Sequence, residues 1–219
     1  PFNRWESARA LAKASLMATI RHAKAPDTAY LEGLSKVVGD TALDPAYRAL
    51  MLGLPAQSEL AASLHTEGDV PDPDAIHLAV EAMRMAQADT MADLLHPIYE
   101  DNQVAQPYAP DAEQSGKRSL ANGVLALITR RDGGVCAQAQ FDMATNMTQQ
   151  LAALGFLIGA GKGDAALAAF EAQWSEDRLV MDKWFGLQVM KAKPDDAADT
   201  ATALTRHAAQ LHQELLVQL

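Results

Sequence analysis

The chain has 219 residues, of which 49% are apolar and 21% charged, a length and composition that fit one large or two small folded domains and exclude wholesale disorder. Its 43 Ala, 27 Leu and 9 Met far outnumber its 10 Val and 5 Ile, and since the former favour helices and β-branched residues favour strands, an all-α fold is predicted. The formal charge of −10 repels phosphate backbones and anionic lipid headgroups, so we expect no nucleic-acid and no membrane partner.

Helix start and stop signals divide the first 71 residues into four helices. Asn3 precedes Glu6 at the spacing of a capping box, which predicts the start of the first helix. Asp44 is followed by a proline, the combination that favours an N-cap and a first helical residue. The helices predicted from these and similar signals cover residues 3–20, 27–39, 45–52 and 58–65.

The same start signal returns at Asp72, which again precedes a proline, and Asp111 is predicted to cap a further helix. Proline cannot continue a helix unperturbed, so Pro97 predicts a kink or a new turn. The resulting elements are a long helix from residue 73, broken near 89, a connection over 102–110, a helix from 111 to a turn at 132–134, and a short helix over 136–143.

The last third of the chain contains the clearest helical pattern. Asn146 and Gln149 form an amide variant of the capping box, and apolar residues then recur at steps of three and four. The helices predicted here cover residues 146–158, 164–174, 178–190 and 195–219. The chain therefore contains about eleven or twelve helices, and their pairing predicts a solenoid-like array of antiparallel helix pairs, a HEAT- or armadillo-like superhelix. A compact orthogonal bundle is the alternative.

No metal site is predicted. None of the six histidines is followed by Glu, so the His-Glu-x-x-His motif of zinc peptidases is absent. His207 and His212 lie five residues apart, which misaligns them on a helix, and solvated histidines explain them better. Asp69, Asp72 and Asp74 crowd one loop, but their spacing lacks the glycine and the final Glu of a calcium loop, and helix caps explain them better.

No nucleophile or phosphate-binding loop is predicted either. The single cysteine, Cys136, forms no internal disulfide, which is compatible with a reducing cytoplasm, and we expect it to be a small buried apolar residue. The glycines at 159, 161 and 163 follow a helix and not a strand, so they do not form a dinucleotide-binding turn. From the residues alone, the chain is a helical scaffold without catalytic or metal-binding residues.

Three stretches nevertheless resemble a known family. They read PFNRWE at residues 1–6, ATNMT running on to LAAL over 144–154, and LVMDKWF over 179–185; residues 72–77 and 99–103 fit less tightly. In this order and at these distances they resemble the C-terminal helical domain of bacterial aminopeptidase N, a zinc metallopeptidase of the gluzincin group. The resemblance covers residues 1–189, while residues 198–219 are unmatched.

The resemblance implies that residues 1–219 are a single helical domain. It also implies that this chain, which lacks an initiating Met, is a fragment of a larger, multidomain cytoplasmic hydrolase of bacteria. It implies that zinc and the catalytic residues lie in a missing upstream domain, so this fragment has no cofactor of its own. The implied partners are the parent enzyme's catalytic and β-sandwich domains and, in the whole enzyme, peptide substrates. The helices would enclose the active-site chamber without being catalytic. The alternative is a free-standing helical-repeat interaction module.

Within the matched stretches, some residues have two interpretations. Core packing explains Trp184, which shares a helix face with Val180 and Leu187, and an N-cap explains Asn146. The candidate domain-interface or chamber-wall residues are Trp5, Glu6, Asn146, Met147, Asp182 and Lys183. No catalytic and no metal-binding residue is predicted.

Overall fold

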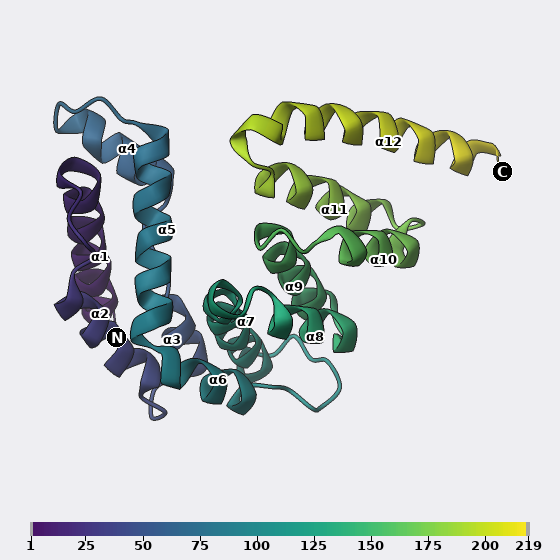
Figure 1. The fold of residues 1–219 in the computed structure, drawn as a ribbon. Helices are drawn as coiled ribbons and strands as arrows, with labels where there is room; N and C mark the ends of the chain where they lie inside the picture. Colours follow the sequence, from purple (N-terminus) through teal and green to yellow (C-terminus); the bar gives the residue numbers. More distant parts are fainter. Residues whose placement is uncertain (1, 218–219) are drawn as a thin grey trace. The chain divides into compact units, whose positions relative to one another are not determined.

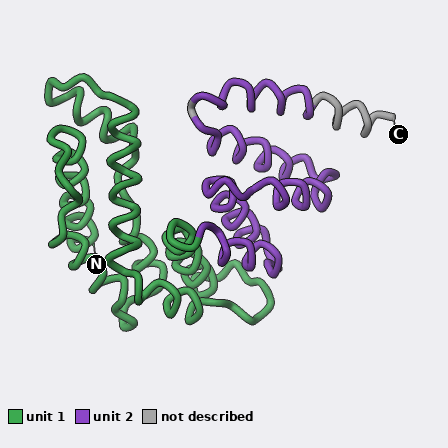
Figure 2. Tube along the Cα trace, in the orientation of Figure 1, with its two compact units in different colours: residues 1–132 green, residues 133–219 purple. Residues whose placement is uncertain are grey.

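The computed structural model describes residues 2–217, and the side chains of residues 2–208 apart from Pro194. The chain forms two compact units, residues 1–132 and 133–219 (Figure 1, Figure 2). The described residues contain twelve α-helices, one 3₁₀ turn and no strand, which confirms the predicted all-α class and helix number. None of the described helices combines the length and the apolar character that a membrane span requires.

The first unit is built around two long helices. Helix α5 packs against α1, α2 and α4, and α7 packs against α3, α5 and α6. The seven helices are α1 (Phe2–His22), α2 (Thr28–Gly39), α3 (Pro45–Met51), α4 (Gln57–Thr66), α5 (Pro73–Thr90), α6 (Ala92–Asp101) and α7 (Ala112–Asp132). Helix α7 has an apolar stripe formed by Leu120, Val124, Leu127 and Ile128, each at most 1% exposed, so this helix lies in the core of the unit.

The second unit is a row of helices that pack on their neighbours. They are α8 (Val135–Met143), α9 (Met147–Gly159), α10 (Asp164–Trp174), α11 (Arg178–Lys191), the 3₁₀ turn η1 (Pro194–Asp196) and α12 (Ala197–Val217). Helix α9 contacts α8, α10 and α11, and α12 packs against α11. The core between them includes Leu154, Phe170 and Trp184, each at most 5% exposed.

Several predicted caps form as expected. Asp44 and Asp72 accept hydrogen bonds from backbone N–H groups of α3 and α5, and a proline occupies the first turn of both helices. Asp111 accepts a hydrogen bond from the Gln114 N–H at the start of α7. Each acceptor satisfies a donor that the first helical turn leaves without an intrahelical partner, which is why the helices begin there.

The predicted capping box at Asn3 is wrong. Helix α1 begins at Phe2, so Asn3 lies inside its first turn and does not cap it. The helix ends at His22, and Ala23 has a positive φ of 51°, a left-handed conformation that stops the helix before Pro26.

Candidate functional site

The six candidate interface residues lie in three places. Trp5 and Glu6 are on α1 in the first unit, and the other four belong to the second unit, two at the start of α9 and two on α11.

On α1, Trp5 belongs to a partly exposed cluster of side chains. Its ring centroid lies 6.0 Å from that of Phe2, and the guanidinium carbon of Arg9 lies 5.8 Å from the Trp5 ring. Arg9 also forms an ion pair with Glu59 of α4, which fixes its side chain against the helix. Glu6 is exposed, and Phe2 is 66% exposed. Trp and Arg are enriched among residues that dominate binding energy at protein interfaces, so this cluster suits a protein contact.

The start of α9 has a structural role. The Asn146 Oδ1 accepts a hydrogen bond of 3.0 Å from the Gln149 N–H, and its Nδ2 donates to the Gln149 Oε1. Met147 is half-buried and packs against the core of the second unit. Both residues therefore have local functions in the fold, and their role in a domain interface stays a prediction.

Removing this cap tests its contribution to stability. Asn146→Ala is expected to lower the free energy of unfolding by about 1 kcal/mol, since the Gln149 N–H loses its acceptor. Urea denaturation followed by circular dichroism measures the change. The exposed neighbour Thr145 provides a control, because Thr145→Ala should change stability by less than about 0.5 kcal/mol. Equal effects of the two variants would show that the cap contributes nothing specific.

Helix α11 has one buried and one exposed face. Val180, Met181 and Trp184 are buried in the core of the second unit, whereas Asp182 and Lys183 are exposed. Leu179 lies four residues before Lys183, and Met190 lies seven residues after it. Both side chains are 75% exposed. Residues at these spacings share one side of a helix, so Lys183 lies on an exposed face that also carries two large apolar side chains.

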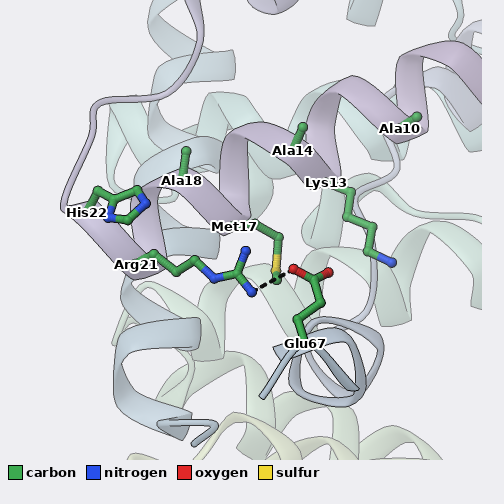
Figure 3. Close-up of a pocket in the computed structure, with 8 residues that line it drawn as sticks. All are labelled: Ala10, Lys13, Ala14, Met17, Ala18, Arg21, His22 and Glu67. Atoms are coloured by element: carbon green, nitrogen blue, oxygen red, sulfur yellow. Dashed lines mark hydrogen bonds and ion pairs between the residues drawn. The ribbon is translucent and has the colours of Figure 1, made fainter. Parts of the chain in front are cut away.

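A shallow groove of about 460 Å³ is lined by residues of α1 and by Glu67, which follows α4 (Figure 3). Ala10, Ala14 and Ala18 follow one another along the helix, while the Arg21 side chain reaches across to Glu67. Arg21 also donates to Asp69, at 2.6 Å, and these hydrogen bonds raise the pKa of Arg21. The groove thus has a wall of small residues and an arginine that two carboxylates satisfy, and Lys13 and His22 also line it.

The Asp69, Asp72 and Asp74 loop is explained without calcium. Asp69 pairs with Arg21, and Asp72 accepts hydrogen bonds from two backbone N–H groups of α5. Asp74 follows within the first turn of α5, where a negative charge complements the helix dipole. The predicted helix cap is confirmed for Asp72, whereas Asp69 pairs with Arg21 and Asp74 lies in the first turn of the helix.

Besides Arg21, three buried or half-buried groups of the first unit have shifted pKa values, namely Tyr30, Arg48 and Arg84. Burial raises the pKa of Tyr30, and it lowers the pKa of Arg48 and of Arg84, the latter helped by nearby Arg130. Arg48 and Arg84 each donate to a backbone carbonyl of another helix or its cap. A guanidinium stays charged near neutral pH and a phenol stays neutral, so these residues do not provide an acid–base pair.

Among the described residues, no three His, Cys, Asp or Glu side chains gather in a way that fits a metal ion. His207 hydrogen-bonds to Glu171, whereas the His212 side chain lies outside the described residues. Cys136 was predicted to be buried, but it is half-buried. It lies on the short helix α8, which leaves this position near the surface.

A sequence family described as "Domain of unknown function (DUF3458_C) ARM repeats" matches residues 1–212. The chain is 32% identical to an aminopeptidase N of Caulobacter vibrioides and 31% identical to one of Escherichia coli; each comparison covers 94% of this chain and 24% of the relative. The chain thus spans about a quarter of the length of these relatives.

A solved structure has the same fold. Legionella pneumophila aminopeptidase A, determined in complex with aspartic acid, superposes with a TM-score of 0.78 at 23% identity, over 94% of this chain and 25% of that protein. The ARM-repeat description agrees with the predicted array of antiparallel helix pairs. The family match extends to residue 212, past residue 189 where the sequence resemblance ended.

Proposed function

Because this chain belongs to the DUF3458_C family of ARM-repeat domains, we propose that it is the C-terminal helical domain of a zinc-dependent aminopeptidase N, which removes N-terminal residues from peptides. The observation that carries the proposal is the similarity over 94% of this chain to aminopeptidase N of two bacteria. We assign the parent enzyme to the bacterial cytoplasm, since the aminopeptidase N relatives are bacterial and the single Cys136 is compatible with a reducing compartment.

In this proposal the domain is not catalytic. Hydrolysis of an N-terminal peptide bond by such an enzyme requires a Lewis acid to polarise the carbonyl and to activate water. The histidines of this sequence lack the spacing that holds zinc, and the described residues do not fit the ion. In this proposal, zinc and the catalytic residues belong to a part of the parent enzyme outside this chain.

The domain instead encloses the active-site chamber through contacts with the parent enzyme's catalytic and β-sandwich domains, so that peptides enter and folded proteins do not. The Phe2, Trp5 and Arg9 cluster and the exposed face of α11 suit such contacts. Aromatic residues, Met and Arg are enriched in protein interfaces, and Phe2, Trp5, Arg9 and Met190 are of these types.

The isolated chain and the longer enzyme test the proposal together. The isolated chain is expected to bind no stoichiometric zinc and to release no amino acid from an aminoacyl-anilide, as measured by metal analysis and an absorbance assay. In the longer enzyme, deleting this domain should leave the zinc content unchanged and relax the preference for short over long peptides.

Two point variants test the same contacts without deleting a folded domain. Trp5→Ala and Lys183→Glu in the longer enzyme should shift the ratio of kcat/KM values for a long and a short peptide, whereas Thr145→Ala should not. Tight zinc at one equivalent in the isolated chain, with chelator-sensitive turnover, would contradict the assignment. An unaltered size preference in the deletion variant would favour an independent interaction module.

A further inference from the structure

Polar side chains gather where α5 meets α2 and α7 in the first unit. Helix α5 packs against both of these helices. Glu81, Arg84 and Gln87 follow one another along α5 at steps of three residues, so each is a neighbour of the next on the helix surface. Tyr30 of α2 lies beside Gln87, and Arg130 of α7 reaches Glu81. We call Tyr30, Arg84, Gln87 and Arg130 the Arg84 cluster.

Several buried atoms of this cluster lack a hydrogen-bond partner. Gln87 is 0% exposed, yet within the described part of the chain neither its Nε2 nor its Oε1 makes a well-formed hydrogen bond. The same is true of the buried Nε of Arg130. Native proteins satisfy nearly all buried polar groups, with protein atoms, ordered water or an ion. The cluster is therefore incomplete with its own side chains alone.

The cluster also carries an excess of positive charge. The Nη2 of Arg130 donates at 3.0 Å to both carboxylate oxygens of Glu81, so these two charges balance each other. Arg84 is half-buried and donates to the Leu52 carbonyl at 3.1 Å, but it forms no ion pair with any residue that the structure describes. Burial and the nearby charge of Arg130 lower the pKa of Arg84 despite the opposing effect of Glu81. The charge of Arg84 is thus not fully compensated.

The chemistry of the free atoms favours an anion. The Gln87 Nε2, the Arg130 Nε and the remaining N–H groups of Arg84 are donors, and the Gln87 Oε1 is the acceptor among these groups. Burial raises the pKa of Tyr30, which keeps its hydroxyl protonated as a further donor. A donor-rich site beside an unpaired guanidinium suits an anion better than a cation. Because Gln87 and Tyr30 are at most 5% exposed, only a small ion fits.

We propose that the Arg84 cluster binds a small monovalent anion such as chloride. Arg84 supplies the compensating charge, and Gln87 and Arg130 supply donors that are otherwise unused. The anion binds only the folded unit, because these side chains come from three helices and meet only there. Binding therefore stabilises the packing of α2 and α7 on α5. This inference does not depend on the proposed enzymatic role.

A chloride titration of the 219-residue chain tests the site. Urea denaturation gives the equilibrium constant for unfolding at constant ionic strength, as sodium chloride replaces sodium methanesulfonate, whose anion is bulkier. This constant should fall about tenfold between a chloride concentration far below the dissociation constant and one about ten times as large as it. An equilibrium constant that does not change across the titration would contradict the proposal.

Two variants identify the residue responsible. Arg84→Met removes the charge, keeps much of the aliphatic volume and should abolish the chloride dependence. Arg131→Met is the matched control, because Arg131 is an exposed arginine of α7 that already pairs with Asp89, and it should preserve the dependence. An equal chloride dependence in the wild type and in Arg84→Met would show that the effect is not specific to this site.

Crystals of the wild-type chain soaked in sodium bromide give a second readout, which does not require any variant to fold. We expect an anomalous bromide peak within hydrogen-bonding distance of the Arg84 guanidinium. Density for a water molecule alone beside Gln87, without bromide, would overturn the proposal and leave the cluster as an internal hydration site.

Discussion

Trp184→Ala is expected to lower the free energy of unfolding by about 3–5 kcal/mol, the usual cost of truncating a buried aromatic side chain. Trp184 is 5% exposed, and its Nε1 donates a hydrogen bond of 3.0 Å to the Leu167 carbonyl of α10. Its ring also meets Phe185 edge-on, with centroids 5.0 Å apart. The alanine variant would leave a cavity in the core, and the Leu167 carbonyl would lose the hydrogen bond that Trp184 donates.

Urea denaturation of the wild type and the variant measures this loss. Leu179→Ala is the matched control, because Leu179 lies on the same helix and is 75% exposed, so its truncation should cost less than about 1 kcal/mol. If Trp184→Ala also costs less than about 1 kcal/mol, the side chain is not part of the core and instead contacts another domain.

The burial of Trp184 could be predicted because the information is local. Val180, Trp184 and Leu187 recur at helical spacing, and the structure buries Val180 and Trp184 and half-buries Leu187. The caps at Asp44 and Asp72 were predictable for the same reason, since an acidic residue followed by proline strongly favours a helix start. Signals contained within one or two helical turns therefore gave most of the helix boundaries.

The prediction at Asn3 was wrong because a capping-box spacing also occurs inside helices. Asn3 and Glu6 are one turn apart whether or not Asn3 is the first residue, and α1 extends back to Phe2. The sequence pattern specifies the spacing between the two side chains, whereas the start of the helix depends on which backbone N–H groups lack partners.

Contacts between distant parts of the chain were not predictable from one sequence. Arg9 meets Glu59 fifty residues away, and Arg21 meets Asp69 across 48 residues. No periodicity relates such positions, since they depend on how the helices pack. The neighbours of Trp5 were therefore missed in part. Phe2 and Arg9 lie three and four residues from Trp5, a helical spacing that could have suggested both contacts. The pairing of Arg9 with Glu59 could not have been suggested in this way.

Arg48→Ala is expected to lower the free energy of unfolding by about 2–4 kcal/mol, because it removes a donor from a buried carbonyl. Arg48 lies on α3, is 5% exposed, and its Nε donates a hydrogen bond of 2.8 Å to the Val38 carbonyl. That carbonyl belongs to the last turn of α2, where backbone acceptors have no intrahelical partner. Burial lowers the pKa of Arg48, and the opposing field of Asp40 and Asp101 helps to keep the guanidinium charged.

Two further variants separate the hydrogen bond from the packing of the arginine stem. Arg48→Met keeps most of the buried aliphatic volume and places no charge inside the unit, so it should cost about 1–2 kcal/mol, less than alanine does. Arg4→Ala removes an exposed arginine of α1 and should change stability by less than about 0.5 kcal/mol. Chemical denaturation gives all three values. If Arg48→Ala lowers the free energy of unfolding no more than Arg4→Ala does, the Arg48 guanidinium is solvated and does not cap α2. If Arg48→Met lowers it as much as Arg48→Ala does, the loss comes from the Val38 carbonyl and not from the volume of the side chain.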